Sequence, residues 1–192
     1  HRRDCLRLSA AGLLAGTFLS AKAWPLAAAE RGEKPARIGF VGVGPRGAGL
    51  LECLVNNVPN VAIPALCDLR PERVQRGIDI VTKTGRPAPV GYCKGEHEYR
   101  TMFERDDLDA ILVATGVQKL APIAIDAMKA GKHAAAEVTG AYTLDDCWKL
   151  VEEKERSGKH YMLLEQCCYD DLNLAILGMI RRGVFGEPYY GE

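Results

Sequence analysis

The 192-residue chain has no excess of charge of either sign and no apolar run long enough to span a membrane. Lysine and arginine total 25, as do aspartate and glutamate, so the formal net charge is zero. No run of like charges appears, which argues against nucleic acid as a partner. An apolar stretch at about residues 8–19 is shorter than the about 20 residues that a spanning helix requires. The rest of the composition is typical of a globular protein with one sizeable core.

The sequence also lacks the cysteine and histidine patterns of metal sites. None of the seven cysteines forms C-x-x-C, and no spacing to the four histidines fits a zinc site. We therefore predict no metal ion. We expect the cysteines to serve mainly as small buried hydrophobic residues. No histidine is assigned a catalytic role. His97 lacks the second His of a zinc-protease helix and is expected to be solvated, and His133 and His160 begin expected strands and are expected to be structural.

Residues 1–29 have the pattern of a twin-arginine export signal. Arg2, Arg3 and Arg7 precede the apolar stretch, and three alanines at 27–29 follow it. A basic start, a short apolar middle and a small-residue end are typical of secretory signals. The sequence therefore predicts an exported, periplasmic protein without membrane contact after signal removal. Because the chain does not begin with Met, we expect its N-terminus to be incomplete.

From residue 35 onward, short β-branched or apolar runs alternate with segments of helical periodicity. Such alternation predicts an α/β fold with a doubly wound parallel sheet, that is, a Rossmann domain. Helix signals such as Thr143 before an acidic first turn and Gly158 at the end support the assignment. The expected strands are 36–43, 60–68, 89–93, 108–114, 132–138 and 159–166; the expected helices are 46–57, 71–85, 96–106, 122–131, 143–158 and 171–186.

We expect residues 35–168 to form the Rossmann domain. The segment 169–192 is expected to be a linking helix and the start of a truncated C-terminal domain, because a strand-like "GEPYYGE" ends the chain. A homo-oligomer would then form through that missing domain.

The stretch "GFVGVGPRGAG" carries three glycines spaced G-x-G-x-x-G, namely Gly42, Gly44 and Gly47. It follows an expected strand and opens an expected helix, which is the context of a dinucleotide-binding loop. The three glycines allow a tight turn, close approach of a pyrophosphate and close packing of helix and strand. Free N–H groups at the helix start favour phosphate, and Arg46 offers a charged contact. A purely structural turn is the alternative.

Asp68 ends the second expected strand, 26 positions after Gly42. A carboxylate at this place suits the ribose hydroxyls of NAD and repels the extra phosphate of NADP. Arg70 beside it is a weak signal for NADP, and a solvated helix cap is the alternative for Asp68. The loops at 115–120, 137–140 and 165–169 follow later strands, so they are expected to surround the same crevice.

With these motifs in place, the chain resembles the Gfo/Idh/MocA oxidoreductase superfamily. The resemblance covers nearly all of residues 35–192 and rests on "IGFVGVGPRG", "CDLRPER", "DLDAILVAT", "AMKAGKHAAAEV", "TLDDC" and "GVFGEP". It implies an NAD-binding Rossmann domain followed by a C-terminal α/β domain that carries the substrate site and often an oligomer interface.

Within the superfamily, the chain is most similar to glycoside hydrolase family 109, the NAD-dependent α-N-acetylgalactosaminidases. Sugar dehydrogenases usually read E-K-P after the fifth strand, whereas this chain reads Glu137-Val138-Thr139. Valine cannot transfer a proton, so that lysine chemistry is absent at this position. "AYTLDDCW" and "LLEQCCY" also match the hydrolase branch. The resemblance implies hydrolysis through a redox cycle, in which a sugar hydroxyl is transiently oxidised and NAD is regenerated.

Cofactor-binding residues follow from the resemblance position by position. They are Gly42, Gly44, Pro45, Arg46 and Gly47 in the phosphate loop, Asp68 at the ribose, Thr115, Val117, Gln118, Lys119 and Leu120 after the fourth strand, Glu137 and Val138 after the fifth, and Gln166 where the family usually has Asn. The family's W-E-W-H is here Val117-Gln118-Lys119-Leu120, which implies altered contacts on the nicotinamide side. The family's catalytic His and Tyr lie beyond residue 192, so we predict no catalytic residue within this chain.

Three functions remain open at this point. The first is an exported enzyme that hydrolyses glycosides through transient oxidation by NAD. The second is an NAD-dependent sugar or polyol dehydrogenase with net turnover of the cofactor. The third is a non-catalytic NAD-binding protein, which the altered loop at 115–120 would favour.

Overall fold

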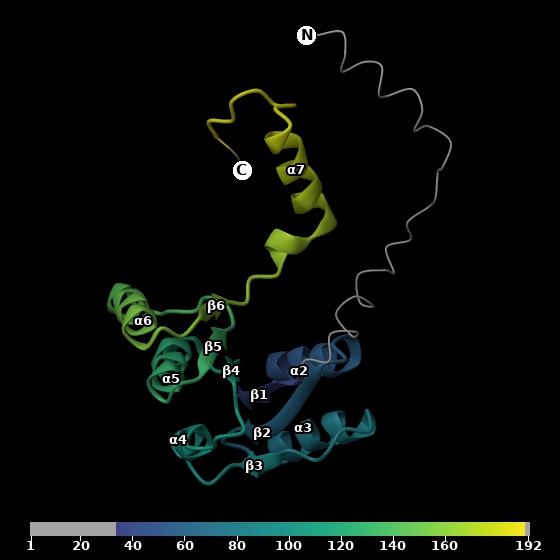
Figure 1. The fold of residues 1–192 in the computed structure, drawn as a ribbon, viewed down its shortest axis with the longest axis vertical. Coiled ribbons are helices and arrows are strands. Elements are labelled where there is room, and N and C mark those ends of the chain that lie inside the picture. The colour runs from purple at the N-terminus through teal and green to yellow at the C-terminus, as the bar shows by residue number, and fades with distance from the viewer. Residues whose placement is uncertain (1–33, 191–192) are drawn as a thin grey trace. The chain divides into compact units, whose positions relative to one another are not determined.

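The computed structural model describes residues 34–190, and its core is one sheet of six parallel strands (Figure 1). The order across the sheet is β3-β2-β1-β4-β5-β6. The strands are β1 (Ala36–Val41), β2 (Val61–Cys67), β3 (Val90–Tyr92), β4 (Ala110–Val113), β5 (His133–Ala136) and β6 (Tyr161–Leu163). The strand order reverses between β1 and β4, which is where ligands bind in doubly wound folds. The predicted fold class is confirmed.

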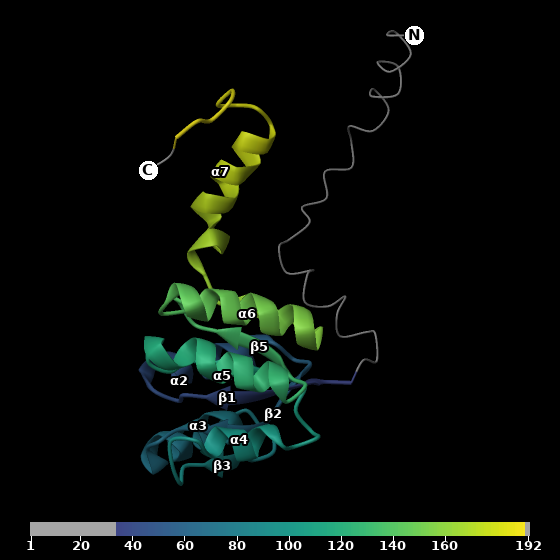
Figure 2. The same cartoon turned by 90° about the vertical axis from the view of Figure 1, so that its left-hand side faces the viewer.

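Helices cover both faces of the sheet, as Figures 1 and 2 show. One face carries α2 (Pro45–Asn57) and α3 (Pro71–Lys83); the other carries α4 (Glu98–Phe103), α5 (Val117–Lys129) and α6 (Leu144–Ser157). Successive strand residues point to opposite faces, so Phe40 packs with α2 and α3 while Val41 packs with α4 and α5. This two-sided burial explains why the strands read as continuous apolar runs.

The predicted capping residues at both ends of α6 are confirmed. The Thr143 hydroxyl accepts a hydrogen bond from the backbone N–H of Asp146, and the Asp146 carboxylate accepts one from the Thr143 N–H. This reciprocal pair satisfies two N–H groups that a helix start leaves open. Gly158 ends the helix in the left-handed conformation, with φ 66°. The ends of α6 are therefore specified by residues close in sequence.

Two sequence expectations were wrong at helix and strand boundaries. Helix α5 begins at Val117, so residues 117–120 form its first turn rather than a loop, and Pro122 lies inside the helix. Proline at the sixth helical position removes one backbone hydrogen bond, but the apolar residues after it bury enough surface to keep the helix. At the C-terminal end, α7 (Asp171–Arg181) follows a short 3₁₀ turn, η1 (Cys167–Tyr169), and residues 187–190 form no strand. Within residues 34–190, no strand lies beside them to pair with.

The cysteine expectation was also wrong. Of the six cysteines in the described region, Cys67 is buried and Cys93 is half-buried, whereas Cys53, Cys147, Cys167 and Cys168 are exposed. The exposed ones lie on α2, α6 and η1 facing solvent, and no disulfide links any of the six. Across residues 34–190, no helix is both long and apolar enough to cross a membrane. The predicted export signal lies outside the described residues.

Candidate cofactor site

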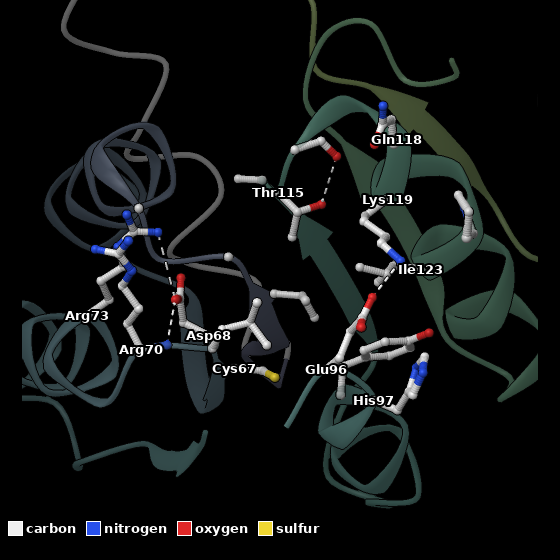
Figure 3. Close-up of a pocket in the computed structure, with 18 of the residues that line it drawn as sticks. Cys67, Asp68, Arg70, Arg73, Glu96, His97, Thr115, Gln118, Lys119 and Ile123 are labelled. Atoms are coloured by element: carbon white, nitrogen blue, oxygen red, sulfur yellow. Dashed lines mark hydrogen bonds and ion pairs between the residues drawn. The ribbon is translucent and has the colours of Figure 1, made fainter. Parts of the chain in front are cut away.

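A cavity of about 670 Å³ opens at the carboxyl ends of the strands (Figure 3). Its lining comes from the loops that follow β1, β2, β3 and β4 and from the first turns of α2, α3, α4 and α5. Eight of the predicted cofactor residues line it: Gly42, Gly44, Pro45, Arg46, Asp68, Thr115, Gln118 and Lys119. The motifs that suggested a dinucleotide therefore meet at one place in the fold.

The glycine loop has the shape that close approach of a phosphate requires. Gly42 has φ +91°, a conformation that side chains strongly disfavour. A Cβ on Gly47 would lie 2.0 Å from the carbonyl oxygen of Gly42, so the first turn of α2 packs directly on the loop. Gly44 caps α2 without any side-chain hydrogen bond. The N–H groups of this helix start thus remain available to an anion, and the loop fits a pyrophosphate.

Asp68 is held in a fixed position at the edge of the cavity. Its Oδ2 accepts a hydrogen bond from the Val43 N–H at 2.7 Å, and its Oδ1 accepts one from the Arg70 N–H at 3.0 Å. The residue is 8% exposed, and the Arg73 guanidinium lies 3.9 Å from Oδ1. Two backbone donors therefore orient the carboxylate beside the glycine loop, where a ribose next to a bound pyrophosphate would lie.

The opposite wall of the cavity carries residues that the sequence did not predict. Figure 3 shows Glu96 and His97 across the cavity from Asp68, with the Glu96 carboxylate directed toward Lys119, its ion-pair partner at 2.6 Å. The Lys119 ammonium lowers the pKa of the Glu96 carboxyl. Glu96 and His97 follow β3, and the rule that loops at strand carboxyl ends meet would have found them. His97 is exposed, as expected, but it lines the cavity.

Cys67 ends β2 at the same cavity but is no candidate nucleophile. Its side chain is 5% exposed, and burial raises the pKa of its thiol to about 12. A nucleophilic cysteine needs the opposite shift, because the thiolate is the reactive form. Cys67 is therefore a packing residue at the inner wall of the cavity.

Six predicted cofactor residues lie outside the cavity lining. Gly47 packs against the loop, Val117 points to solvent and Leu120 is fully buried in the core below α5. The other three are Glu137, Val138 and Gln166, in the segments that follow β5 and β6. Leu120 stands where the family's loop has His, and its burial leaves no contact with a cofactor in this arrangement.

Arg46 connects the glycine loop to two of these outlying residues. Its Nε donates a hydrogen bond to Glu137 Oε1 at 2.8 Å, and its Nη2 donates one to Gln166 Oε1 at 2.9 Å. Glu137 is 9% exposed, and one residue further along the chain the Val138–Thr139 peptide bond is cis. The phosphate loop and the segments after β5 and β6 are thus joined through one side chain.

Residues 36–164 match the family model described as "Oxidoreductase family, NAD-binding Rossmann fold", designated GFO_IDH_MocA. The chain belongs to the Gfo/Idh/MocA oxidoreductase family. Its cofactor is NAD, and the glycine loop and Asp68 of this Gfo/Idh/MocA domain fit that cofactor. Within residues 34–190, no group of three or more His, Cys, Asp or Glu side chains is placed to hold a metal ion.

Curated relatives of this Gfo/Idh/MocA domain carry the name of the hydrolase branch. "Glycosyl hydrolase family 109 protein 1" of Bacteroides thetaiotaomicron is 43% identical over 156 residues, covering 81% of this chain and 33% of the relative. "Glycosyl hydrolase family 109 protein" of Shewanella pealeana is 37% identical over 212 residues, covering all of this chain and 45% of the relative. The chain therefore spans between a third and a half of these relatives, and the predicted resemblance to this branch is confirmed.

Solved structures share the fold. Myo-inositol 2-dehydrogenase from Lactobacillus plantarum superimposes with a TM-score of 0.70 at 20% identity, covering 80% of this chain and 43% of that one. Scyllo-inositol dehydrogenase from Lactobacillus casei, crystallised with NAD(H) and scyllo-inositol, gives 0.70 at 16% identity, covering 80% and 43%. At these identities the likeness establishes the Rossmann architecture.

Proposed function

We propose that the protein containing this chain is an exported NAD-dependent enzyme that hydrolyses glycosides through transient oxidation of the sugar. The observation that carries the proposal is the 43% identity to a protein named for glycosyl hydrolase family 109, over a segment that contains the glycine loop and Asp68. The triplet Glu137-Val138-Thr139 supports it, because a lysine for proton transfer is missing at Val138.

In this function the residues of this chain hold and orient the cofactor. The N–H groups at the start of α2 bind the pyrophosphate, and Asp68 accepts hydrogen bonds from the adenosine ribose. When bound, NAD supplies a hydride acceptor that returns the hydride in the same cycle, so the cofactor is not consumed. Catalytic side chains come from outside this chain, and the sugar substrate is bound there.

Cleavage of nitrophenyl glycosides by the full-length protein tests this proposal. With NAD present only in amounts equal to the enzyme, we expect many turnovers of nitrophenol release and no accumulation of NADH, measured at 340 nm. A matched assay without added NAD, after removal of bound cofactor, is expected to lose the activity. Release of nitrophenol that is indifferent to NAD would contradict the proposal.

The sugar or polyol dehydrogenase is the second candidate. The inositol dehydrogenases that share this fold favour it, although at identities of 16% and 20%. It would require stoichiometric conversion of NAD to NADH with each sugar oxidised, which the same 340 nm measurement detects. The third candidate, a non-catalytic NAD-binding protein, draws support from the altered sequence at 117–120, in the first turn of α5, and from the burial of Leu120. It would retain NAD without either activity.

We further propose that the protein reaches the periplasm by the twin-arginine route and forms a homo-oligomer through residues beyond this chain. The paired Arg2 and Arg3 before an apolar stretch support the export signal. Replacing both with lysine is expected to keep the protein in the cytoplasm, as measured by cell fractionation and immunoblotting. A periplasmic pool unchanged by the double substitution would argue for another route.

A further inference from the structure

Arg46 reaches across the point where the strand order of the sheet reverses. It occupies the first turn of α2, directly after β1, yet both acceptors of its guanidinium follow strands on the other side of β4 (Figure 1). Because β4 lies between β1 and β5, the loops that follow β1 and β5 are about 10 Å apart at the normal strand spacing, and β6 lies one strand farther away. Arg46 thus crosses the crevice in which a dinucleotide passes from one half of the sheet to the other.

The contacts of Arg46 are those of a structural bridge rather than of a free phosphate ligand. The side chain of Glu137 is 11% exposed and that of Arg46 is 50% exposed. A nearly buried carboxylate with a charged donor at 2.8 Å forms a strong, directional hydrogen bond. The second bond, to Gln166, uses another nitrogen of the same planar group and fixes its orientation. Moving Arg46 onto a phosphate would leave the Glu137 carboxylate without its charged partner.

We propose that Arg46 is a positioning residue that couples the two halves of the NAD site. Its guanidinium stays on Glu137 and Gln166 when NAD binds, and so holds the segments after β5 and β6 against the glycine loop. The adenosine diphosphate half is bound by the α2 N–H groups and Asp68, and Arg46 sets the place of the nicotinamide half. This inference rests on NAD binding, which the family establishes, and not on the proposed hydrolysis.

The test is a double-mutant cycle on ligand affinity in the full chain, using calorimetry with NAD and with ADP. R46M, E137Q and the double variant are each expected to weaken the binding of NAD by about 10-fold, because all three remove the same charge-assisted contact. ADP contains the pyrophosphate but no nicotinamide, so its affinity is expected to stay within about 2-fold. E137Q preserves the shape of the side chain and carries the test if R46M folds poorly.

The chain offers a matched control on α6. Arg156 donates two hydrogen bonds to Glu153, with side-chain exposures of 64% and 6%, far from the glycine loop in the fold. R156M removes an ion pair of the same kind, and its NAD affinity is expected to remain unchanged. Four results would overturn the proposal. The first two are unchanged NAD affinity in R46M and equal weakening of ADP and NAD binding by R46M. The others are effects of R46M and E137Q that multiply in the double variant and a similar loss of NAD affinity in R156M.

Discussion

Replacing Gly47 with alanine is expected to abolish measurable NAD binding and to lower the free energy of unfolding by about 3 kcal/mol. The added Cβ would lie 2.0 Å from the carbonyl oxygen of Gly42, which is far inside van der Waals contact. The obstructing atom belongs to the backbone, so no side-chain rotation relieves the clash. Helix α2 must therefore move away from the loop, and its N–H groups lose their place at the pyrophosphate.

Gly49, two residues later in the same helix, provides the control. A Cβ there meets nothing within 4 Å, and the position is exposed. Gly49→Ala is expected to leave NAD affinity unchanged and to stabilise the protein by about 0.5–1 kcal/mol, because alanine restricts the unfolded chain. Urea unfolding and calorimetry with NAD on both variants make the comparison. Normal NAD affinity in Gly47→Ala would show that the loop does not hold the pyrophosphate.

Local sequence predicted the parts of the site whose geometry is set by neighbouring residues. The glycine spacing fixes a strand, a tight turn and a helix start within about ten residues, so Gly42 and Gly47 were found without a structure. Asp68 was predicted as a cofactor residue because it stands at the end of an apolar run that predicts a strand. The start of α5 was missed because proline is common at the first position of a helix, so the helix was expected to begin at Pro122. The turn before Pro122 is buried in the core, and this burial favours a helix that begins earlier.

The sequence predicted that loops at the strand carboxyl ends meet, but not which side chains of distant segments touch. Glu96 and His97 line the same cavity as Asp68 because β3 pairs beside β2 in the sheet. The guanidinium of Arg46 was expected at a phosphate, and its bridge to Glu137 spans 91 positions of sequence. Such pairings depend on strand order, and the alternation of strands and helices predicts a doubly wound sheet without specifying which loops touch.

Asp68→Asn is expected to weaken NAD binding by about 10- to 100-fold and to shift the preference of the site toward NADP. The carboxylate accepts hydrogen bonds from the N–H groups of both Val43 and Arg70. An asparagine side chain has one oxygen, so its NH₂ group must face one of these donors. That mismatch is buried and is expected to cost about 1–3 kcal/mol of stability. Loss of the negative charge also removes the repulsion of a 2′-phosphate, beside which the Arg70 side chain lies exposed.

Asp109→Asn separates this effect from general destabilisation. Asp109 directly precedes β4, at the amino ends of the strands and so opposite to the cavity, and it accepts hydrogen bonds from the backbone and the guanidinium of Arg37. The Arg37 contact lowers the pKa of Asp109 to about 2, so its substitution removes a carboxylate that accepts hydrogen bonds away from the cavity, although Asp109 is more exposed than Asp68. The ratio of the NAD and NADP dissociation constants, measured by calorimetry, is expected to change in Asp68→Asn and to stay fixed in Asp109→Asn. If Asp68→Asn weakens the binding of NAD and NADP equally, the carboxylate orders the glycine loop through its hydrogen bond with Val43 and makes no selective contact with the ribose.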